Sequence, residues 1–238
     1  MISVQETPDS FLTEAYKSLE FSNGIGYYPI DAEVPNLSLG KVSWFAQAKE
    51  LGAKAIYFVE DYPAVLFFAL DKDLGENTSA LEERIRNLHL KVWNTGSVPV
   101  FFVALPHELR IYSAYQKPAK TLEEWRSSNR WLDHVESLTK VIELTDFSRQ
   151  MIESGRLFQK YQDEFNLNKR VDNFLLSNLR LLREKLEKGD VSKRLSVHAL
   201  IGRSIFIRYL EDRRILTEDY FSIYLLLYYQ SLRRIFRI

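Results

Sequence analysis

The stretch AIYFVEDYPAVLFFALD, residues 55–71, decides the fold of this chain. Two runs of β-branched and aromatic residues, 55–61 and 63–71, meet at Asp61-Tyr62-Pro63, a combination typical of a tight connection between strands. We therefore expect two neighbouring strands here. Just upstream, WFAQAKELGAK predicts a helix from about Trp44 to Leu51 that ends at Gly52.

The residues that follow extend the same pattern. ALEERIRNLHLKVWN carries apolar residues at the spacing of an amphipathic helix, namely Leu81, Ile85, Leu88 and Val92. Residues 98–105 and 109–116 then predict a second strand pair, separated by Pro106-His107-Glu108. Because a helix falls between strands that can pair across it, the order indicates a mixed α/β sheet.

The sequence changes character near residue 118. No proline occurs after Pro118, and long stretches have helical periodicity, near 121–153, 170–188, 195–214 and 217–236. Short loops between such helices favour a compact bundle. We therefore expect two domains, an α/β (α+β) domain with a mixed sheet over residues 1–118 and an α-helical bundle over residues 119–238.

The composition is that of an ordinary globular protein, with 46% apolar and 27% charged residues and a formal net charge of zero. Residues 1–120 contain 11 Lys and Arg against 15 Asp and Glu, whereas residues 121–238 contain 21 against 17. This imbalance favours an anionic partner for the second half, although a solvated helical surface explains it equally well. The absence of cysteine, of a signal peptide and of a membrane-spanning run favours the cytoplasm and no membrane partner.

A strand-strand-helix-strand order resembles the core of PD-(D/E)xK nucleases, in which carboxylates hold a divalent metal. Asp61 lies where the first metal ligand is expected, but the next strand offers Phe67-Phe68-Ala69-Leu70 in place of the acid-x-lysine. The only substitutes are Asp71, Lys72 and Asp73, and adjacent residues on a strand point to opposite faces. We therefore expect a degenerate nuclease-like fold without a metal site. The alternative is a magnesium-dependent endonuclease that uses Asp61, Asp71, Lys72 and Asp73.

Two readings apply to the end of the helix near residue 93. Trp93 and Asn94 suit a stacking and hydrogen-bonding pair for nucleic acid. The flanking apolar run favours the other reading, in which Trp93 fills the interface between sheet and helix while Asn94 caps the helix before Gly96.

The segment HALIGRSIFIRYLEDRRIL, residues 198–216, is unusually dense in both apolar and charged residues. It resembles the helical segment that precedes the catalytic domain in adenine-specific DNA methyltransferases of restriction-modification systems. The matching positions are His198, Ala199, Leu200, Gly202, Arg203, Phe206, Tyr209, Leu210, Glu211, Asp212 and Arg213. The preceding LLSNLRLLREKL and the strand segments before it are similar to parts of the same family, so the resemblance covers roughly residues 50–236.

Elementary physics gives this helix a structural role as well. A helix that is apolar nearly all round must be enclosed, and Gly202 would permit the close approach of a neighbouring helix. Arg208 and Asp212 are four residues apart and can form an ion pair. Other basic side chains near this helix are candidates for contacts with DNA phosphates, and these are Lys193, Arg194, Arg203, Arg213 and Arg214.

The resemblance implies a larger protein. The chain ends at Ile238, where the family continues into its catalytic domain, so we expect that this chain lacks methyl-transfer activity by itself. Its parent would be an adenine-specific DNA methyltransferase, with or without restriction endonuclease activity. Its partners would be DNA and the C-terminal methyltransferase domain or subunit, which would bind S-adenosylmethionine. Two alternatives stay open: the endonuclease above, with magnesium as its cofactor, and a protein-docking module that does not bind DNA.

Overall fold

A computed structural model of the chain describes residues 6–31, 37–71, 78–128, 131–212 and 215. The described residues form two compact units, which we call the sheet unit, up to Phe174, and the helical unit, from Leu175 onward. The boundary between the two units falls inside one helix, α7 (Val171–Glu187).

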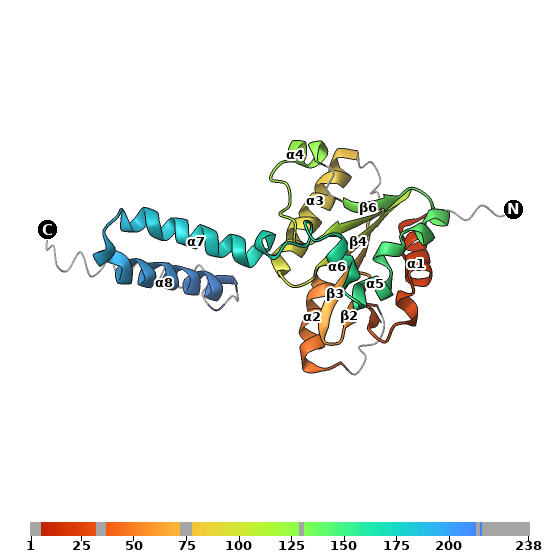
Figure 1. Ribbon diagram of the computed structural model, residues 1–238, viewed down its shortest axis with the longest axis horizontal. Coiled ribbons are helices and arrows are strands. Elements are labelled where there is room, and N and C mark those ends of the chain that lie inside the picture. The colour runs from red at the N-terminus through yellow and green to blue at the C-terminus, as the bar shows by residue number, and fades with distance from the viewer. Residues whose placement is uncertain (1–5, 32–36, 72–77, 129–130, 213–214, 216–238) are drawn as a thin grey trace, which may run out of the picture. The chain divides into compact units, whose positions relative to one another are not determined.

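The sheet unit is built on a six-stranded mixed sheet whose strands lie in chain order (Figure 1). The strands are β1 (Tyr27–Pro29), β2 (Ala55–Val59), β3 (Tyr62–Ala69), β4 (Val100–Leu105), β5 (Glu108–Ser113) and β6 (Trp131–Val135). Only β3 and β4 pair in parallel, and the other neighbours are antiparallel. The parallel pair requires a crossover, which the long helix α3 (Thr78–Thr95) supplies.

The central strands are buried on both faces, which explains why their sequences are continuously apolar. Along β3, Val65 and Phe67 face one core, whereas Leu66 and Phe68 face the other. The same alternation continues along β4, because side chains of successive strand residues point to opposite faces.

Helices cover both faces of the sheet (Figure 1). One face is covered by α1 (Pro8–Ser18), η1 (Phe21–Asn23), η2 (Leu138–Glu143), η3 (Thr145–Phe147), α5 (Arg149–Glu153) and α6 (Arg156–Lys160). The opposite face is covered by α2 (Leu39–Glu50), α3 and α4 (Leu122–Ser127). The short helix η4 (Leu167–Lys169) then leads into α7.

The described part of the helical unit contains the rest of α7, the short helix η5 (Val191–Lys193) and α8 (Arg194–Asp212). The turn between the two long helices includes Lys188 and Gly189, both with positive φ. Leu179 of α7 and Ile201 of α8 line the same small pocket, so the two helices face each other as a hairpin.

The first strands and helices follow the sequence prediction closely, and the mixed α/β sheet is confirmed. The second half differs. A single helix over 121–153 was wrong, because this stretch contains α4, the edge strand β6, two 3-10 turns and α5. Residues 119–174 therefore belong with the sheet, and the unit boundary lies at 174/175 instead of 118/119.

The expected helix over 217–236 lies outside the described residues, so a closed bundle stays a prediction. Within the described ranges, no helix has the length and apolar character needed to cross a bilayer.

Candidate functional site

Asp61, the first nuclease candidate, lies in the turn between β2 and β3. Its carboxylate accepts a hydrogen bond from the Ser38 hydroxyl at 3.0 Å and lies 3.7 Å from the Lys41 ammonium. The preceding Glu60 adopts a positive φ of 55°, which shapes the turn. The contacts of Asp61 are those of a turn residue that anchors the start of α2.

Asp71, the second candidate, lies beyond the other end of β3. An eight-residue strand separates it from Asp61, which corresponds to about 25 Å of extended chain. The two carboxylates therefore cannot share a metal ion, and the carboxylate pair that the endonuclease alternative requires is not assembled from Asp61 and Asp71. Lys72 and Asp73 lie outside the described residues. In the described ranges, no group of three His, Asp or Glu side chains is placed to hold a metal.

Trp93 is part of the packed interior. Its side chain is buried, its indole N–H donates to the Lys169 carbonyl at 3.4 Å, and its ring meets Phe174 edge to face. Asn94 is exposed in the last turn of α3, and Gly96 follows with a φ of 70°. These contacts favour a packing role for Trp93. Asn94 does not cap the helix as expected, because α3 continues to Thr95.

Two pockets of the sheet unit flank residues 164–170. The first, which we call the aromatic pocket, has a volume of about 660 Å³ and lies at the end of the sheet where β3 and β4 begin. It is lined mainly by apolar and aromatic side chains, including Tyr62, Tyr115, Phe158 and Phe165, with Gln162, Ser97 and Arg170 as its polar groups.

Arg170 is held in a fixed position at the aromatic pocket. Its guanidinium donates to the Gly96 carbonyl at 2.7 Å, forms an ion pair with Asp172 at 3.4 Å and lies 5.3 Å from the centre of the Tyr115 ring. Three partners from three segments thus orient one planar cation against an aromatic face.

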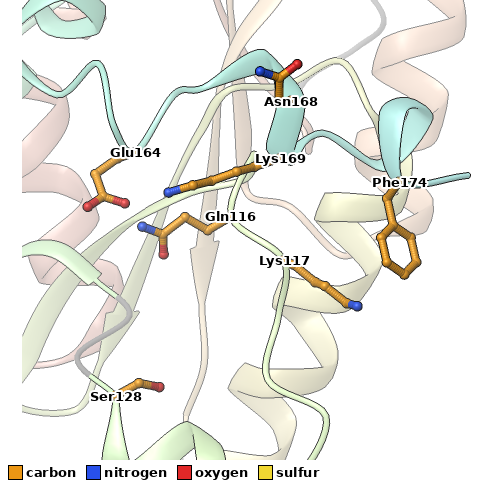
Figure 2. A pocket seen from close by; sticks show the side chains of 7 residues that line it. All are labelled: Gln116, Lys117, Ser128, Glu164, Asn168, Lys169 and Phe174. Atoms are coloured by element: carbon orange, nitrogen blue, oxygen red, sulfur yellow. The ribbon is translucent and has the colours of Figure 1, made fainter. Parts of the chain in front are cut away.

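The second pocket, which we call the lysine pocket, has a volume of about 520 Å³ (Figure 2). It is lined by Gln116, Lys117, Ser128, Glu164, Asn168, Lys169 and Phe174. Figure 2 shows the Lys169 side chain extending toward Glu164 and Gln116, while the Lys117 ammonium lies 3.8 Å from the centre of the Phe174 ring. Two lysines against one glutamate give this pocket a net positive charge.

Glu164 has an unusual environment in the lysine pocket. Its Oε2 atom is buried and has no hydrogen-bond partner among the described residues. A buried acceptor without a donor is costly, by about 1–3 kcal/mol.

The helical unit has a different kind of surface, because most of its large apolar side chains are exposed. The exposed apolar residues on α7 and α8 are Leu175, Leu176, Leu181, Leu182, Leu186, Leu195, Leu200, Ile205, Phe206, Ile207 and Tyr209. We call this set the apolar surface of the helical unit. The described part of the chain does not enclose the dense helix, and its expected enclosure stays a prediction because residues 216–238 lie outside the described residues.

The residues that carry the family resemblance lie in this unit. His198 and Gly202 line a pocket of about 280 Å³ between the two helices. A Cβ added to Gly202 would meet no atom within 4 Å, so the close helix contact expected there is not present in the described structure. Arg208 forms an ion pair with Glu211 at 3.2 Å, and its expected ion pair with Asp212 stays a prediction because the Asp212 side chain lies outside the described residues.

Three of the five predicted DNA contacts are described, and all three are exposed. Lys193 forms an ion pair with Asp190 at 3.2 Å, and Arg194 lies 3.5 Å from the Glu187 carboxylate. Hydrogen bonds from Ser192 and Lys193 lower the pKa of Asp190. Arg203 has no ion-pair partner among the described residues. Arg213 and Arg214 lie outside them.

The sequence analysis missed both pockets of the sheet unit. Their residues come from 59–64, 97–99, 115–117, 128 and 152–174, so no short motif marks them. The one available signal was the aromatic and cationic composition of YQKPAK, at the end of the strand predicted over 109–116, and of FNLNKRVDNF, in the half predicted to be helical.

No protein-family model, curated protein or solved structure matches this chain.

Proposed function

We propose that this chain is the non-catalytic N-terminal part of a DNA restriction-modification methyltransferase. The helical unit docks the catalytic part, and the chain as a whole engages DNA and positions that part on it. The methyl donor, S-adenosylmethionine, belongs to the catalytic part in this proposal. The observation that carries the proposal is the apolar surface of the helical unit.

This surface favours a protein partner for a physical reason. Two helices cannot bury apolar side chains that point away from their common interface, and each buried Å² of apolar surface contributes about 25 cal/mol. Exposed apolar side chains in this number on two helices are typical of a surface that binds another protein. The resemblance of residues 198–216 to a connector helix identifies the catalytic methyltransferase part as the partner that we propose.

The charge of the helical unit supports the DNA part of the proposal. Residues 175–212 contain eight Lys and Arg against five Asp and Glu. Arg203, one of these eight, has no ion-pair partner among the described residues, and the lysine pocket of the sheet unit adds two lysines against one glutamate. Positive surfaces of this kind attract the phosphates of DNA.

We further propose that the sheet unit is a degenerate nuclease-like domain. Support comes from the antiparallel pair β2–β3, followed by the crossover helix α3 and the parallel strand β4. The apolar residues Phe67 and Phe68 occupy β3 where an active enzyme of this type would carry its acid and lysine.

The test is complex formation with the methyltransferase domain or subunit encoded together with this chain, measured by sedimentation velocity. We expect a one-to-one complex whose affinity falls by about tenfold or more in Phe206→Asp, because a central aromatic residue often dominates an interface. Ile25→Asp is the matched control, since Ile25 is 98% exposed but belongs to the sheet unit.

Circular dichroism spectra of both variants check that the fold is retained. Equal affinities of the two variants, or no complex with the wild-type chain, would contradict the docking proposal. Binding to a labelled 30-base-pair duplex, measured over a range of KCl concentrations, tests the DNA part separately. We expect the affinity for the duplex to fall steeply as the KCl concentration rises. If the chain binds the methyltransferase part but not the duplex, the DNA part of the proposal is wrong and the chain is a protein-docking module.

A further inference from the structure

We propose that the aromatic pocket binds a small organic acid that carries a planar aromatic ring. The ring would lie against the aromatic side chains of the pocket, and the carboxylate would lie against the Arg170 guanidinium. This inference goes beyond the proposed function, because the pocket belongs to the sheet unit and its ligand is neither DNA nor the methyltransferase part.

The aromatic pocket has the size and the lining of a small-molecule site. Its volume of about 660 Å³ lies in the range of pockets that enclose such ligands, which are mostly apolar with a few polar groups. Pro63 and Pro99 line the pocket and have no backbone N–H, so neither adds a donor to its wall. Aliphatic side chains of Val59, Ile152 and Leu167 complete the lining, which therefore favours a ligand with an apolar body.

Four aromatic side chains favour a ring over an aliphatic body. The rings of Phe158 and Phe165 meet edge to face with their centres 5.0 Å apart, and Tyr115 meets Phe165 at 6.1 Å. Tyr62 is 75% exposed, so most of its ring is available to a ligand. Aromatic pairs attract each other beyond the effect of the area that they bury, so a planar ring gains more from these walls than a saturated ring of the same size.

Arg170 makes the pocket selective for an anion. Among the described residues that line the pocket, it is the only one with a charged side chain, so the lining is positive. Its Nη2 atom donates to the Gly96 carbonyl at 2.7 Å, and its buried Nε atom lies 3.4 Å from the Asp172 carboxylate. Its Nη1 atom donates to no described residue, so two N–H groups stay available for a carboxylate.

Asp172 weakens the charge of Arg170 but does not occupy the site. The Asp172 side chain does not line the pocket, and it is 56% exposed, so water screens the ion pair. The Gly96 carbonyl and the Tyr115 ring, whose centre lies 5.3 Å from the guanidinium, orient Arg170 before a ligand arrives. Because the guanidinium is already ordered, binding costs less conformational entropy.

The test is an NMR titration of the full chain with three probes: 2-naphthoate, 2-naphthamide and decahydro-2-naphthoate. The second probe has the ring without the charge, and the third has the charge without an aromatic ring. We expect 2-naphthoate to bind about tenfold or more tightly than 2-naphthamide, because the amide lacks the charged hydrogen bond to Arg170. We expect it to bind about threefold or more tightly than the saturated acid, which lacks the ring contacts.

Backbone amide signals locate the bound probe. The largest shifts should occur at residues of the pocket such as Ser97, Tyr115 and Phe165, and residues 175–212 should shift little. Larger shifts over residues 175–212 than at the pocket would show that 2-naphthoate binds the apolar surface of the helical unit, and they would overturn the site.

Two variants assign the two parts of the pocket. Arg170→Gln should weaken 2-naphthoate by about tenfold or more and leave 2-naphthamide unchanged, a difference that a general loss of packing would not produce. Gln162→Trp, at an exposed lining position, should abolish the binding of all three probes, because its indole would occupy the pocket. Arg156→Gln, at an exposed arginine of α6 that does not line the pocket, is the matched control and should change no affinity.

Each remaining outcome contradicts a stated part of the inference. Equal affinities for 2-naphthoate and 2-naphthamide would overturn the carboxylate, and equal affinities for the aromatic and saturated acids would overturn the planar ring. Arg170→Gln and Gln162→Trp proteins that behave like Arg156→Gln, or a wild-type chain that binds none of the probes, would overturn the site. Failure of docking and of DNA binding with intact 2-naphthoate binding would contradict only the proposed function.

Discussion

Replacing Tyr112 with phenylalanine tests the packing of the sheet unit at a single oxygen atom. The Tyr112 ring is fully buried, stacked on Phe101 at 5.0 Å and near Trp125 at 5.9 Å. Its hydroxyl is also buried, and the Arg110 guanidinium lies near it without forming a well-directed hydrogen bond. Because a buried polar group without a partner costs about 1–3 kcal/mol, we expect Tyr112→Phe to raise the free energy of unfolding by about 1 kcal/mol at pH 7.

The same hydroxyl predicts a pH dependence. Burial raises the pKa of Tyr112 to about 12, although the nearby Arg110 guanidinium offsets part of the effect. The unfolded chain ionises near the ordinary tyrosine pKa of about 10, so the contribution is complete below that pH and is lost as the pH rises toward the folded value. The raised pKa of Tyr112 should therefore cost the folded protein on the order of 1 kcal/mol of stability at pH 11.

Urea unfolding followed by tryptophan fluorescence at pH 7 and pH 11 measures both effects. Wild-type protein should lose on the order of 1 kcal/mol more stability than Tyr112→Phe between these pH values, because the other tyrosines contribute equally to both proteins. Tyr62→Phe, a change at an exposed tyrosine, is the control and should match the wild type. A Tyr112→Phe protein that is less stable at pH 7, or equally sensitive to pH, would refute the reasoning.

Four further substitutions have definite expected outcomes. Gly26→Ala would place a Cβ 1.9 Å from the Phe58 carbonyl oxygen and should lower the free energy of unfolding by about 2 kcal/mol or more. Gly40→Ala in α2 has open space around it and should raise the free energy of unfolding by up to about 1 kcal/mol. A lower melting temperature for the first variant and a higher one for the second would verify both. Gly202→Ala should likewise stabilise α8 by up to about 1 kcal/mol in urea titrations followed at 222 nm, and a loss would reveal a close neighbour. Asp190→Asn should destabilise the helical unit at neutral pH but not at low pH. The lowered pKa of Asp190 means that its charged carboxylate stabilises the folded unit, and this stabilisation is lost as the pH falls below the ordinary carboxyl range. The helicities of wild type and variant should therefore converge on acid titration.

The central strands could be predicted because their signals are local. Residues 55–59 and 62–69 combine β-branched and aromatic residues with a turn between them, and the positive φ of Gly52 ends α2 as expected. The parallel pairing of β3 with β4 followed from the helix between them.

The edge of the sheet could not be predicted in the same way. Strand β6, WLDHV, is short and half-buried, and it is a strand because it pairs with β5 through contacts such as His134 with Arg110. Such pairing is tertiary, and the absence of glycine and proline in this region favoured a helix instead.

The segments that pack around α8 could not be predicted from the sequence either. Periodicity shows that Ile205 and Phe206 require cover, but it does not identify what covers them. The two pockets escaped prediction for a related reason, since Tyr62, Tyr115 and Arg170 become neighbours only through the fold.

Hydrogen-deuterium exchange of this chain, alone and with the methyltransferase domain or subunit encoded together with it, tests the central claim most directly. Docking through the apolar surface predicts slower exchange in peptides covering residues 175–212 when the partner is present, and unchanged exchange in β3 and β4. Unchanged exchange over residues 175–212 at saturating partner concentration would contradict the account.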